Sequence, residues 1–146
     1  MSRVADILAV KGSTVHTLDK KAMVFEAVKM MVDHNVGSLV VTDGDAVHGI
    51  FTERDYLRRI VLEGRTSKTT ALAEVASERL IVVDPSRLLE ECMAMMTSER
   101  LRHLPVIDGG KLAGIISIGD IVKHLSSERD AEVRYLTDYI SGKYPG

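Results

Sequence analysis

Two short segments of the sequence place a hydroxyl three residues before a carboxylate: Thr52 before Asp55, and Ser117 before Asp120. At the start of a helix, the hydroxyl can accept a hydrogen bond from a backbone N–H, and the carboxylate can reach back to the capping residue. The same helix end offers unpaired N–H donors and partial positive charge to a phosphate. A carboxylate there can also accept two hydrogen bonds from the neighbouring hydroxyls of a ribose. The segments therefore predict either structural helix caps or a nucleotide site.

The two segments are counterparts in an internal repeat. Residues 15–60 align without a gap with residues 80–125 at an offset of 65, and eleven of these 46 positions are identical. About 3 identities are expected from ordinary residue frequencies. Units of about 60 residues are each too small to bury a good core, so we expect the two to share one core about a pseudo-twofold axis. A site made by one unit should therefore have a counterpart in the other.

The elements that must position these segments are predicted from apolar spacing and turn signals. Val24, Ala27, Val28, Met31 and Val32 form a stripe of helical period, which Leu89, Cys92, Met93 and Met96 repeat. Asp-Gly pairs between β-rich runs predict hairpins. In chain order, each unit should contain a short helix (3–8 or 71–76), a β-prone segment (14–18 or 80–83), the amphipathic helix (22–34 or its copy), a hairpin (39–42 with 46–51, or 104–107 with 112–116) and a second helix (53–62 or 119–126).

The predicted fold class is α/β, of the α+β type, with two β-α-β-β-α repeats about a pseudo-twofold axis. The repeats span residues 3–62 and 71–126. The polar stretch 63–70 reads as an exposed, mobile linker. Residues 127–146 are expected to form an added C-terminal helix and tail, since Val133, Leu136 and Ile140 recur at helical spacing.

Composition excludes several classes of partner and compartment. The 146 residues are 45% hydrophobic and 27% charged, which suits one globular domain. A net charge of −2 without a basic block argues against nucleic acid. No apolar run is long enough for a membrane span, and the start lacks the hydrophobic stretch of a signal peptide. We therefore expect a cytoplasmic protein.

The sequence carries no catalytic constellation or metal-ligand pattern. Its single cysteine, Cys92, takes the place of Ala27 in the repeat and reads as a small buried residue rather than a reactive thiol. The histidines lack ligand spacing, and no cysteine cluster supports a zinc site. A nucleophile elbow and a phosphate loop are also missing. We expect no metal, no catalytic cofactor and no enzyme activity.

The duplicated pattern resembles the paired cystathionine β-synthase, or CBS, domains, also called a Bateman module. In each copy a glycine (Gly49 or Gly114) and two or three apolar residues precede the hydroxyl and carboxylate, after a strand reading Leu-Val-Val-Thr-Asp or Leu-Pro-Val-Ile-Asp. The resemblance covers about residues 3–126. It implies a regulatory module that binds AMP, ADP, ATP, NAD or S-adenosylmethionine in two clefts between the repeats, with AMP or NAD as our expected ligand.

The resemblance also assigns roles to individual positions. Asp55 and Asp120 would hold ribose hydroxyls, while Thr52 and Ser117 would contact ribose or phosphate. The β-prone segments would face the adenine, and residues just before the first hairpin strand would bind phosphate. The candidate nucleotide-binding residues are Thr14, Val15, His16, Gly37, Ser38, Thr52, Arg54, Asp55, Leu80, Ile81, Val82, Arg102, His103, Ser117 and Asp120.

The two clefts should differ in charge. Gly37 and Ser38 of the first unit correspond to Arg102 and His103 of the second, whereas Arg54 corresponds to Gly119. One cleft should therefore bind an anionic nucleotide better, although the packing decides which cleft receives which side chain. Arg54 can equally be read as a solvated helix residue, and His103 as an ordinary packed histidine.

Two equivalent methionines suggest a further surface. Met30 and Met95 lie about 200° from the apolar stripe of their helices. We assign them to a homodimer interface, which the resemblance also favours; burial of both helix faces within the monomer is the competing account.

The functional hypothesis is a stand-alone nucleotide sensor. The dimer would bind an adenosine nucleotide, report energy or redox state, and alter an unidentified partner protein in trans. The rival hypothesis is a ligand-free structural dimeric adaptor in which the hydroxyl–carboxylate pairs are only helix caps.

Overall fold

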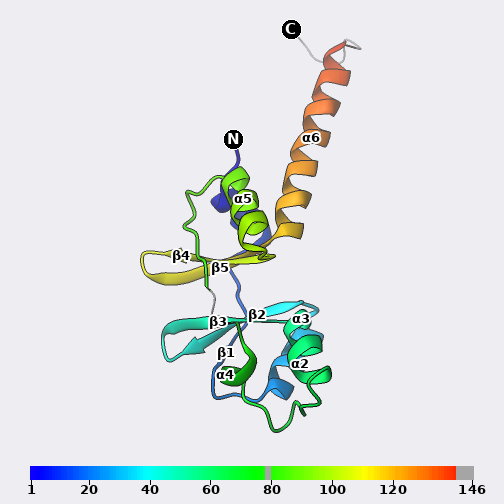
Figure 1. Ribbon diagram of the computed structural model, residues 1–146. Helices are drawn as coiled ribbons and strands as arrows, with labels where there is room; N and C mark the ends of the chain where they lie inside the picture. The colour runs from blue at the N-terminus through cyan, green and yellow to red at the C-terminus, as the bar shows by residue number, and fades with distance from the viewer. Residues whose placement is uncertain (78–79, 141–146) are drawn as a thin grey trace.

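The computed structural model describes residues 1–77 and 80–140. It folds the repeats into two small α/β units that lie one above the other in Figure 1, with the sheets in the middle, helices on the outer sides and one long helix extending from the body. The elements up to the linker are α1 (Val4–Lys11), β1 (Thr17–Asp19), α2 (Val24–His34), β2 (Ser38–Asp43), β3 (Ala46–Thr52), α3 (Glu53–Asp55) and the π-helical segment η1 (Tyr56–Val61). The remaining elements are α4 (Leu72–Val75), α5 (Leu89–Glu99), β4 (His103–Asp108), β5 (Lys111–Ser117) and α6 (Ile118–Ile140). The predicted fold class is confirmed.

The two hairpins are equivalent in register and both are confirmed. β2 pairs with β3 from Ser38–Thr52 to Asp43–Ala46, and β4 pairs with β5 from His103–Ser117 to Asp108–Lys111. Both ladders shift register at the same place, after Val41 and after Val106. Glycines with positive φ close both turns, as two-residue hairpin loops require. The hairpins therefore deliver Thr52 and Ser117 to equivalent ends of the two sheets.

The β-prone segments are shorter than predicted. β1 begins at Thr17 and runs parallel to β2, so Thr14–His16 precede the strand. In the second repeat, Leu80–Val82 form no strand, and Val83 alone makes a parallel bridge to Val106. The Val83 N–H donates to the Pro105 carbonyl at 3.0 Å. The proline at this position cannot donate a ladder hydrogen bond itself, which limits the pairing.

The first helix of each repeat packs into the core of the other repeat. Val4 and Ile7 of α1 are buried among the side chains of α5, β4, β5 and α6. Leu72 and Val75 of α4 are buried among those of α2, β2, β3 and η1. The prediction of one shared core is therefore wrong: there are two cores, and each hairpin–helix unit completes its own by taking a helix from the other. This exchange holds the repeats together.

Matching backbone hydrogen bonds show the pseudo-twofold relation. The Val4 N–H donates to the Arg87 carbonyl, and the Leu72 N–H donates to the Ala22 carbonyl, each at 2.9 Å. Ala22 and Arg87 are 65 residues apart, but Val4 and Leu72 are 68 apart. The first repeat therefore has three more residues between its short helix and its hairpin, and the two copies differ there.

Most of the predicted apolar stripe is buried. Val24, Ala27 and Met31 face the core, as do Leu89, Cys92 and Met96. Val32 was placed in the stripe but is 73% exposed, because it lies at the edge of the helix face and no described element covers it. Met30 and Met95 are partly buried and pack against the two cores. Their contacts favour the competing account of burial within the monomer.

The predicted linker is not a detached segment. Its carbonyls at Ser67 and Thr70 accept hydrogen bonds from the Phe25 and Val24 N–H groups at 3.0 and 2.8 Å. These bonds satisfy the first turn of α2, whose N-cap Met23 has no side-chain acceptor. Thr70 is buried and its hydroxyl donates to the Thr66 carbonyl at 2.8 Å. The linker is thus mostly exposed, as predicted, but it caps α2.

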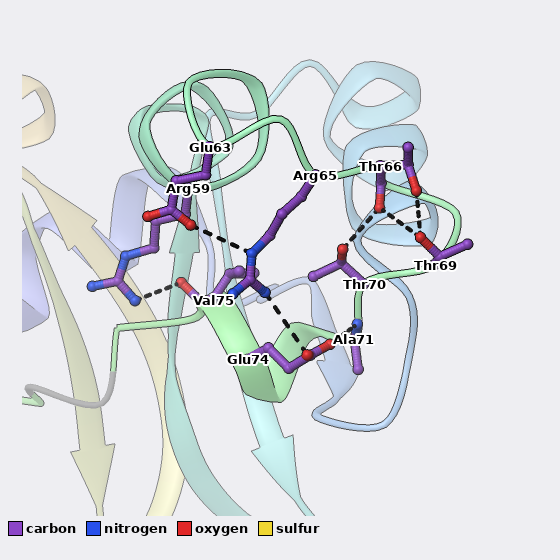
Figure 2. A network of polar contacts seen from close by, with 9 residues as sticks. All are labelled: Arg59, Glu63, Arg65, Thr66, Thr69, Thr70, Ala71, Glu74 and Val75. Carbon is purple, nitrogen blue, oxygen red and sulfur yellow. Dashed lines mark hydrogen bonds and ion pairs between the residues drawn. The ribbon is translucent and has the colours of Figure 1, made fainter.

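Arginines tie the linker to the neighbouring helices (Figure 2). Arg65 lies between Glu63 at 3.4 Å and Glu74 at 3.8 Å, and Arg59 donates to the Val75 carbonyl at 3.0 Å. η1, the linker and α4 are therefore linked by polar contacts as well as by the core.

The second helix of repeat 2 and the added C-terminal helix are one element. α6 runs continuously from Ile118 to Ile140 and leaves the body of the protein along its C-terminal half (Figure 1). The predicted break near residue 126 is wrong because neither glycine nor proline occurs between residues 121 and 140. The predicted tail at residues 141–146 lies outside the described residues.

Candidate functional site

Both hydroxyl–carboxylate segments form capping boxes. The Asp55 N–H donates to Thr52 Oγ1 at 3.2 Å, and the Thr52 N–H donates to Asp55 Oδ2 at 3.0 Å. The Asp120 N–H donates to Ser117 Oγ at 3.1 Å, and the Ser117 N–H donates to Asp120 Oδ2 at 2.8 Å. The structural interpretation is confirmed in both copies. These contacts use Oδ2 of each carboxylate, so capping and ligand binding are compatible.

A cleft of about 850 Å³ lies between the repeats beside Thr52 and Asp55, and we name it the Asp55 cleft. This volume falls within the range of about 300–1,000 Å³ typical of small-molecule sites. Repeat 1 contributes the end of β3 and the start of the following helix, and repeat 2 contributes the end of α5 and the start of β4. The lining residues are Gly37, Ile50, Thr52, Glu53, Arg54, Asp55, Arg58, Ser77, Ile81, Glu99, Arg100, Leu101, Arg102 and His103.

Positive charge is concentrated in the Asp55 cleft. Arg54 from repeat 1 and Arg102 with His103 from repeat 2 line the same cavity, which the sequence left undecided. Arg58 and Arg100 add two more guanidinium groups. Carboxylates are present as well, since Glu53, Asp55 and Glu99 share the lining. Among the described lining residues the four arginines outnumber the three carboxylates, so this part of the cleft combines a carboxylate with a surplus of cations.

Arg58 and Arg100 were missed by the sequence analysis. Arg58 follows Asp55 by one helical turn, a spacing that could have indicated a shared face. Arg100 is the C-cap of α5 and adopts a left-handed conformation with φ of 55°. Its counterpart Asn35 has φ of 52°, and asparagine tolerates this region better than arginine does. An arginine held in a costly backbone conformation beside a cleft is typical of a functional position.

His103 lies near both candidate carboxylates. Burial lowers the pKa of its imidazole, the charges of Lys11 and Arg102 lower it further, and Asp120 and Asp55 oppose the effect. The ring is half-buried at the start of β4, where His103 pairs with Ser117 of β5. The histidine is therefore held mainly neutral at pH 7, which makes the arginines the permanent cations of the cleft.

The candidates from the β-prone segments separate between the two sides. Ile81 lines the Asp55 cleft, whereas Leu80 and Val82 are not among its lining residues. His16, the counterpart of Ile81, stacks on His34 with ring centroids 4.1 Å apart, and its carbonyl accepts the Val40 N–H at 3.0 Å. Thr14 is exposed and Val15 is half-buried beside them. The repeat relation assigns these three residues to the other side of the molecule, near Asp120.

Gly37 and Ser38 separate in the same way. Gly37 lines the Asp55 cleft and lies close to Glu53, whose carboxyl carbon would be 3.6 Å from an added Cβ. Ser38 pairs with Thr52 in the hairpin and does not belong to the lining. Seven of the fifteen candidates therefore line the Asp55 cleft: Gly37, Thr52, Arg54, Asp55, Ile81, Arg102 and His103. Ser117 and Asp120, the counterparts of Thr52 and Asp55 in repeat 2, are not among its lining residues.

The Asp120 side has a different electrostatic environment. Lys11 Nζ lies 2.8 Å from Asp120 Oδ2 and also donates to the Ile115 carbonyl at 2.8 Å. Burial by itself would raise the pKa of Asp120, but the hydrogen bonds from Lys11 and Ser117 outweigh it and lower the pKa. The carboxylate is therefore ionised and already paired. Lys11 was also missed, because the sequence does not reveal that α1 crosses to repeat 2.

Residues 1–77 and 80–140 contain neither a metal-ligand cluster nor a membrane-spanning helix. No group of three or more histidine, cysteine, aspartate or glutamate side chains in this part of the chain could hold a metal ion. Within the same residues, none of the helices has the length and hydropathy needed to span a bilayer. The cytoplasmic location stays a prediction.

Comparisons with known proteins agree with the duplicated architecture. The family model described as "CBS domain" matches residues 4–62 and 72–127. The CBS domain-containing protein CBSX3, mitochondrial, of Arabidopsis thaliana is 40% identical over 97% of this chain and 73% of its own length. A structure from Burkholderia ambifaria, described as a signal-transduction protein with CBS domains, has 48% identity and a TM-score of 0.81 over 85% of this chain and 93% of that chain. The hexameric CBS-CP12 protein of bloom-forming cyanobacteria has 30% identity and a TM-score of 0.75 over 84% and 70% of the two chains.

The two family matches coincide with the two repeats, and each includes one capping box beside the interface between the repeats. This chain therefore belongs to the CBS domain family and contains a pair of CBS domains.

Proposed function

We propose that the chain is a regulatory module that binds an adenosine nucleotide, AMP or NAD in the first place, in the Asp55 cleft. CBS-domain pairs are commonly regulatory, ligand-binding modules. The observation that carries the proposal is the convergence in one cleft of Asp55 and Thr52 with Arg54, Arg100 and Arg102. Asp55 would accept hydrogen bonds from the ribose, and the arginines would bind phosphate, for which guanidinium groups are well suited.

The cleft offers an apolar surface for the base as well. Ile50 and Ile81 lie on opposite repeats and both line the cavity, with Leu101 beside them. A flat adenine could lie between such side chains and gain from apolar burial. The Ile50 backbone pairs with Ser77, so this part of the cleft is held in place by the sheet. The proposed pose therefore assigns the base, the sugar and the phosphate to three different groups of residues.

A signal from the cleft would reach an adjoining surface of repeat 1. A groove of about 670 Å³ lies between α2 and η1 and shares Gly37 and Glu53 with the Asp55 cleft. Its lining includes Val32 and Leu57, which are 73% and 55% exposed. A ligand that contacts Glu53 could therefore change a surface suited to a second copy or to a regulated protein. We propose that the output is delivered to a partner protein in trans, through a dimer.

The structural adaptor remains the second candidate because the capping boxes are real. The bonds between Thr52 and Asp55 would exist in a protein that binds no ligand. The cyanobacterial CBS-CP12 relative is hexameric, which supports this candidate. The adaptor hypothesis predicts oligomers without nucleotide affinity.

Calorimetric titration with AMP, ADP, ATP and NAD, each to millimolar concentration, tests the proposal. Asp55→Asn keeps a capping acceptor but loses the anionic ribose ligand. Its matched control is Asp6→Asn, because Asp6 Oδ2 accepts the Arg3 N–H at 2.8 Å in the capping box of α1, away from the cleft. Binding lost in Asp55→Asn and kept in Asp6→Asn supports the sensor. Native mass spectrometry showing a stable oligomer, with no binding of any of the four nucleotides, would favour the adaptor.

A further inference from the structure

The Asp120 carboxylate already has a cationic partner from within the chain. Lys11 Nζ donates to Asp120 Oδ2 at 2.8 Å and to the Ile115 carbonyl at 2.8 Å. The Ser117 N–H donates to the same carboxylate oxygen. The side chains of Lys11 and Asp120 are only 38% and 26% exposed, so the pair is partly shielded from water. The ammonium therefore lies beside the carboxylate to which a ribose hydroxyl would donate, and it already offsets the charge of that carboxylate.

Lys11 reaches this position because α1 is longer than its counterpart α4. α1 has eight residues and α4 has four. The last turn of α1 packs closely on β5, since a Cβ added at Gly114 would lie 2.7 Å from Leu8 Cδ2. The chain after α4 is extended instead where it packs on repeat 1, and Ser77 exchanges two backbone hydrogen bonds with Ile50, at 3.0 and 3.2 Å. The Ile50 carbonyl thus has a backbone donor where the equivalent Ile115 carbonyl has the Lys11 ammonium.

The Asp55 carboxylate has a different set of partners. Among the residues that the structure describes, its hydrogen bonds involve Thr52 alone, and no described lysine or arginine forms an ion pair with it. Asp55 also lines an open cleft. A ribose can approach this carboxylate without first displacing a cation.

The Lys11 contact is a cost that a ribose would meet at Asp120 and would not meet at Asp55. A hydrogen bond between an ammonium and a carboxylate is roughly twice as strong as one between neutral groups. The hydroxyls of a ribose are neutral donors, and they would also leave the ammonium without its partners. A displacement cost near 1.4 kcal/mol corresponds to a tenfold loss of affinity. The counterpart positions of Arg100 and Arg102 are Asn35 and Gly37, so fewer cations are present there to offset this loss.

We propose that Lys11 fills the ribose position of the Asp120 side and thereby restricts the chain to one nucleotide, bound in the Asp55 cleft. This inference rests on the proposed function for its ligand. It makes Lys11 a specificity-determining residue: its removal exposes a second nucleotide site, which requires Ser117 and Asp120.

Isothermal titration of the full chain with AMP, and separately with NAD, tests the inference in wild type and in Lys11→Met. The wild type should bind one nucleotide per chain, and Lys11→Met should bind two, the second at least tenfold tighter than any second event in wild type. Lys11→Arg should retain a single site because the guanidinium restores the cation. The control is Lys20→Met, since Lys20 forms an ion pair with Asp43 at 3.0 Å outside the clefts. This control should leave the stoichiometry at one.

Substitution of the carboxylates identifies the site that is gained. Asp120→Asn added to Lys11→Met should remove only the second event, and Asp55→Asn should remove only the first. Two equivalent sites in wild type, or one site in a folded Lys11→Met protein, would overturn the role of Lys11 while leaving nucleotide binding intact. If wild type binds no nucleotide and Lys11→Met binds one, the blocking role of Lys11 would be supported, but the Asp55 cleft would be overturned as the nucleotide site. No binding in either protein would overturn both.

Discussion

The two sides of the CBS pair share a backbone and differ in charge. Thr52–Asp55 and Ser117–Asp120 form the same capping box with hydrogen bonds of nearly the same length. Around Asp55 the structure gathers Arg54, Arg58, Arg100 and Arg102, whereas Asp120 is paired with Lys11. A capping box constrains a few backbone atoms, but the side chains that surround it come from distant elements. The two copies therefore keep the same capping box while the charged side chains around it differ.

The largest expected difference between the two sides is the loss of nucleotide affinity when each carboxylate is replaced. Asp55→Asn should weaken AMP or NAD binding by about 1.5–3 kcal/mol, which is about ten- to 150-fold, because a charged hydrogen-bond acceptor is lost. Asp120→Asn should change the affinity less than threefold, about 0.6 kcal/mol, since Lys11 already occupies this carboxylate. Titration calorimetry of both variants measures the difference. Equal losses would mean that the two sides act alike.

A smaller effect is expected at the strained arginine. Arg100→Asn should weaken binding of an anionic nucleotide by about three- to tenfold, because a cation leaves the Asp55 cleft. The same change should stabilise the fold by about 0.5 kcal/mol, because asparagine tolerates the positive φ better. Urea unfolding measures the gain in stability, and titration calorimetry on the same sample measures the loss of nucleotide affinity. The matched change Asn35→Arg at the counterpart should destabilise without affecting the Asp55 cleft; weaker binding in that variant would contradict the separation of the two sides.

The close contact between α1 and β5 predicts a modest loss of fold stability when Gly114 is replaced. Gly114→Ala should cost about 1 kcal/mol, because the new Cβ displaces the Leu8 side chain from β5. The displacement should also loosen Lys11 at the end of the same helix. Thermal unfolding measures the cost, and the expected shift is a few degrees. An unchanged melting temperature would show that α1 does not pack tightly enough to hold Lys11.

The smallest effect is the pH dependence linked to His103. Its pKa is lowered in the folded protein by burial and by Lys11 and Arg102, so the unfolded chain binds the proton more readily. The free energy of unfolding should therefore be greatest above pH 6.5, the ordinary pKa of histidine, and should decrease as the pH falls below that value. Urea unfolding at pH 7.5 and 5.5 should show a smaller decrease in His103→Gln than in wild type. Lys11→Met should raise the pKa of His103 in an NMR titration; no change would mean that the two groups do not interact.

Local features of the fold were predictable from the sequence because they depend on neighbouring residues. The Asp-Gly turns, the amphipathic stripes through Val24 and Leu89, and both capping boxes follow from contacts within a few residues. The repeat then predicted the same arrangement twice. Val32 was misplaced because helical period alone does not say which neighbour covers the edge of a stripe. The single helix α6 was missed because its apolar spacing is interrupted near residue 129, although nothing there ends a helix.

The sequence by itself determined the duplicated unit, the two hydroxyl–carboxylate segments and the unequal distribution of basic residues. Only the tertiary structure decided that Arg54 and Arg102 meet in one cleft and that Lys11 pairs with Asp120. The physical reason is the exchange of α1 and α4 between the repeats, which joins segments more than 80 residues apart, such as Val4 and Arg87. Such contacts depend on how two buried cores are completed, and this is not encoded in the spacing of residues along either copy.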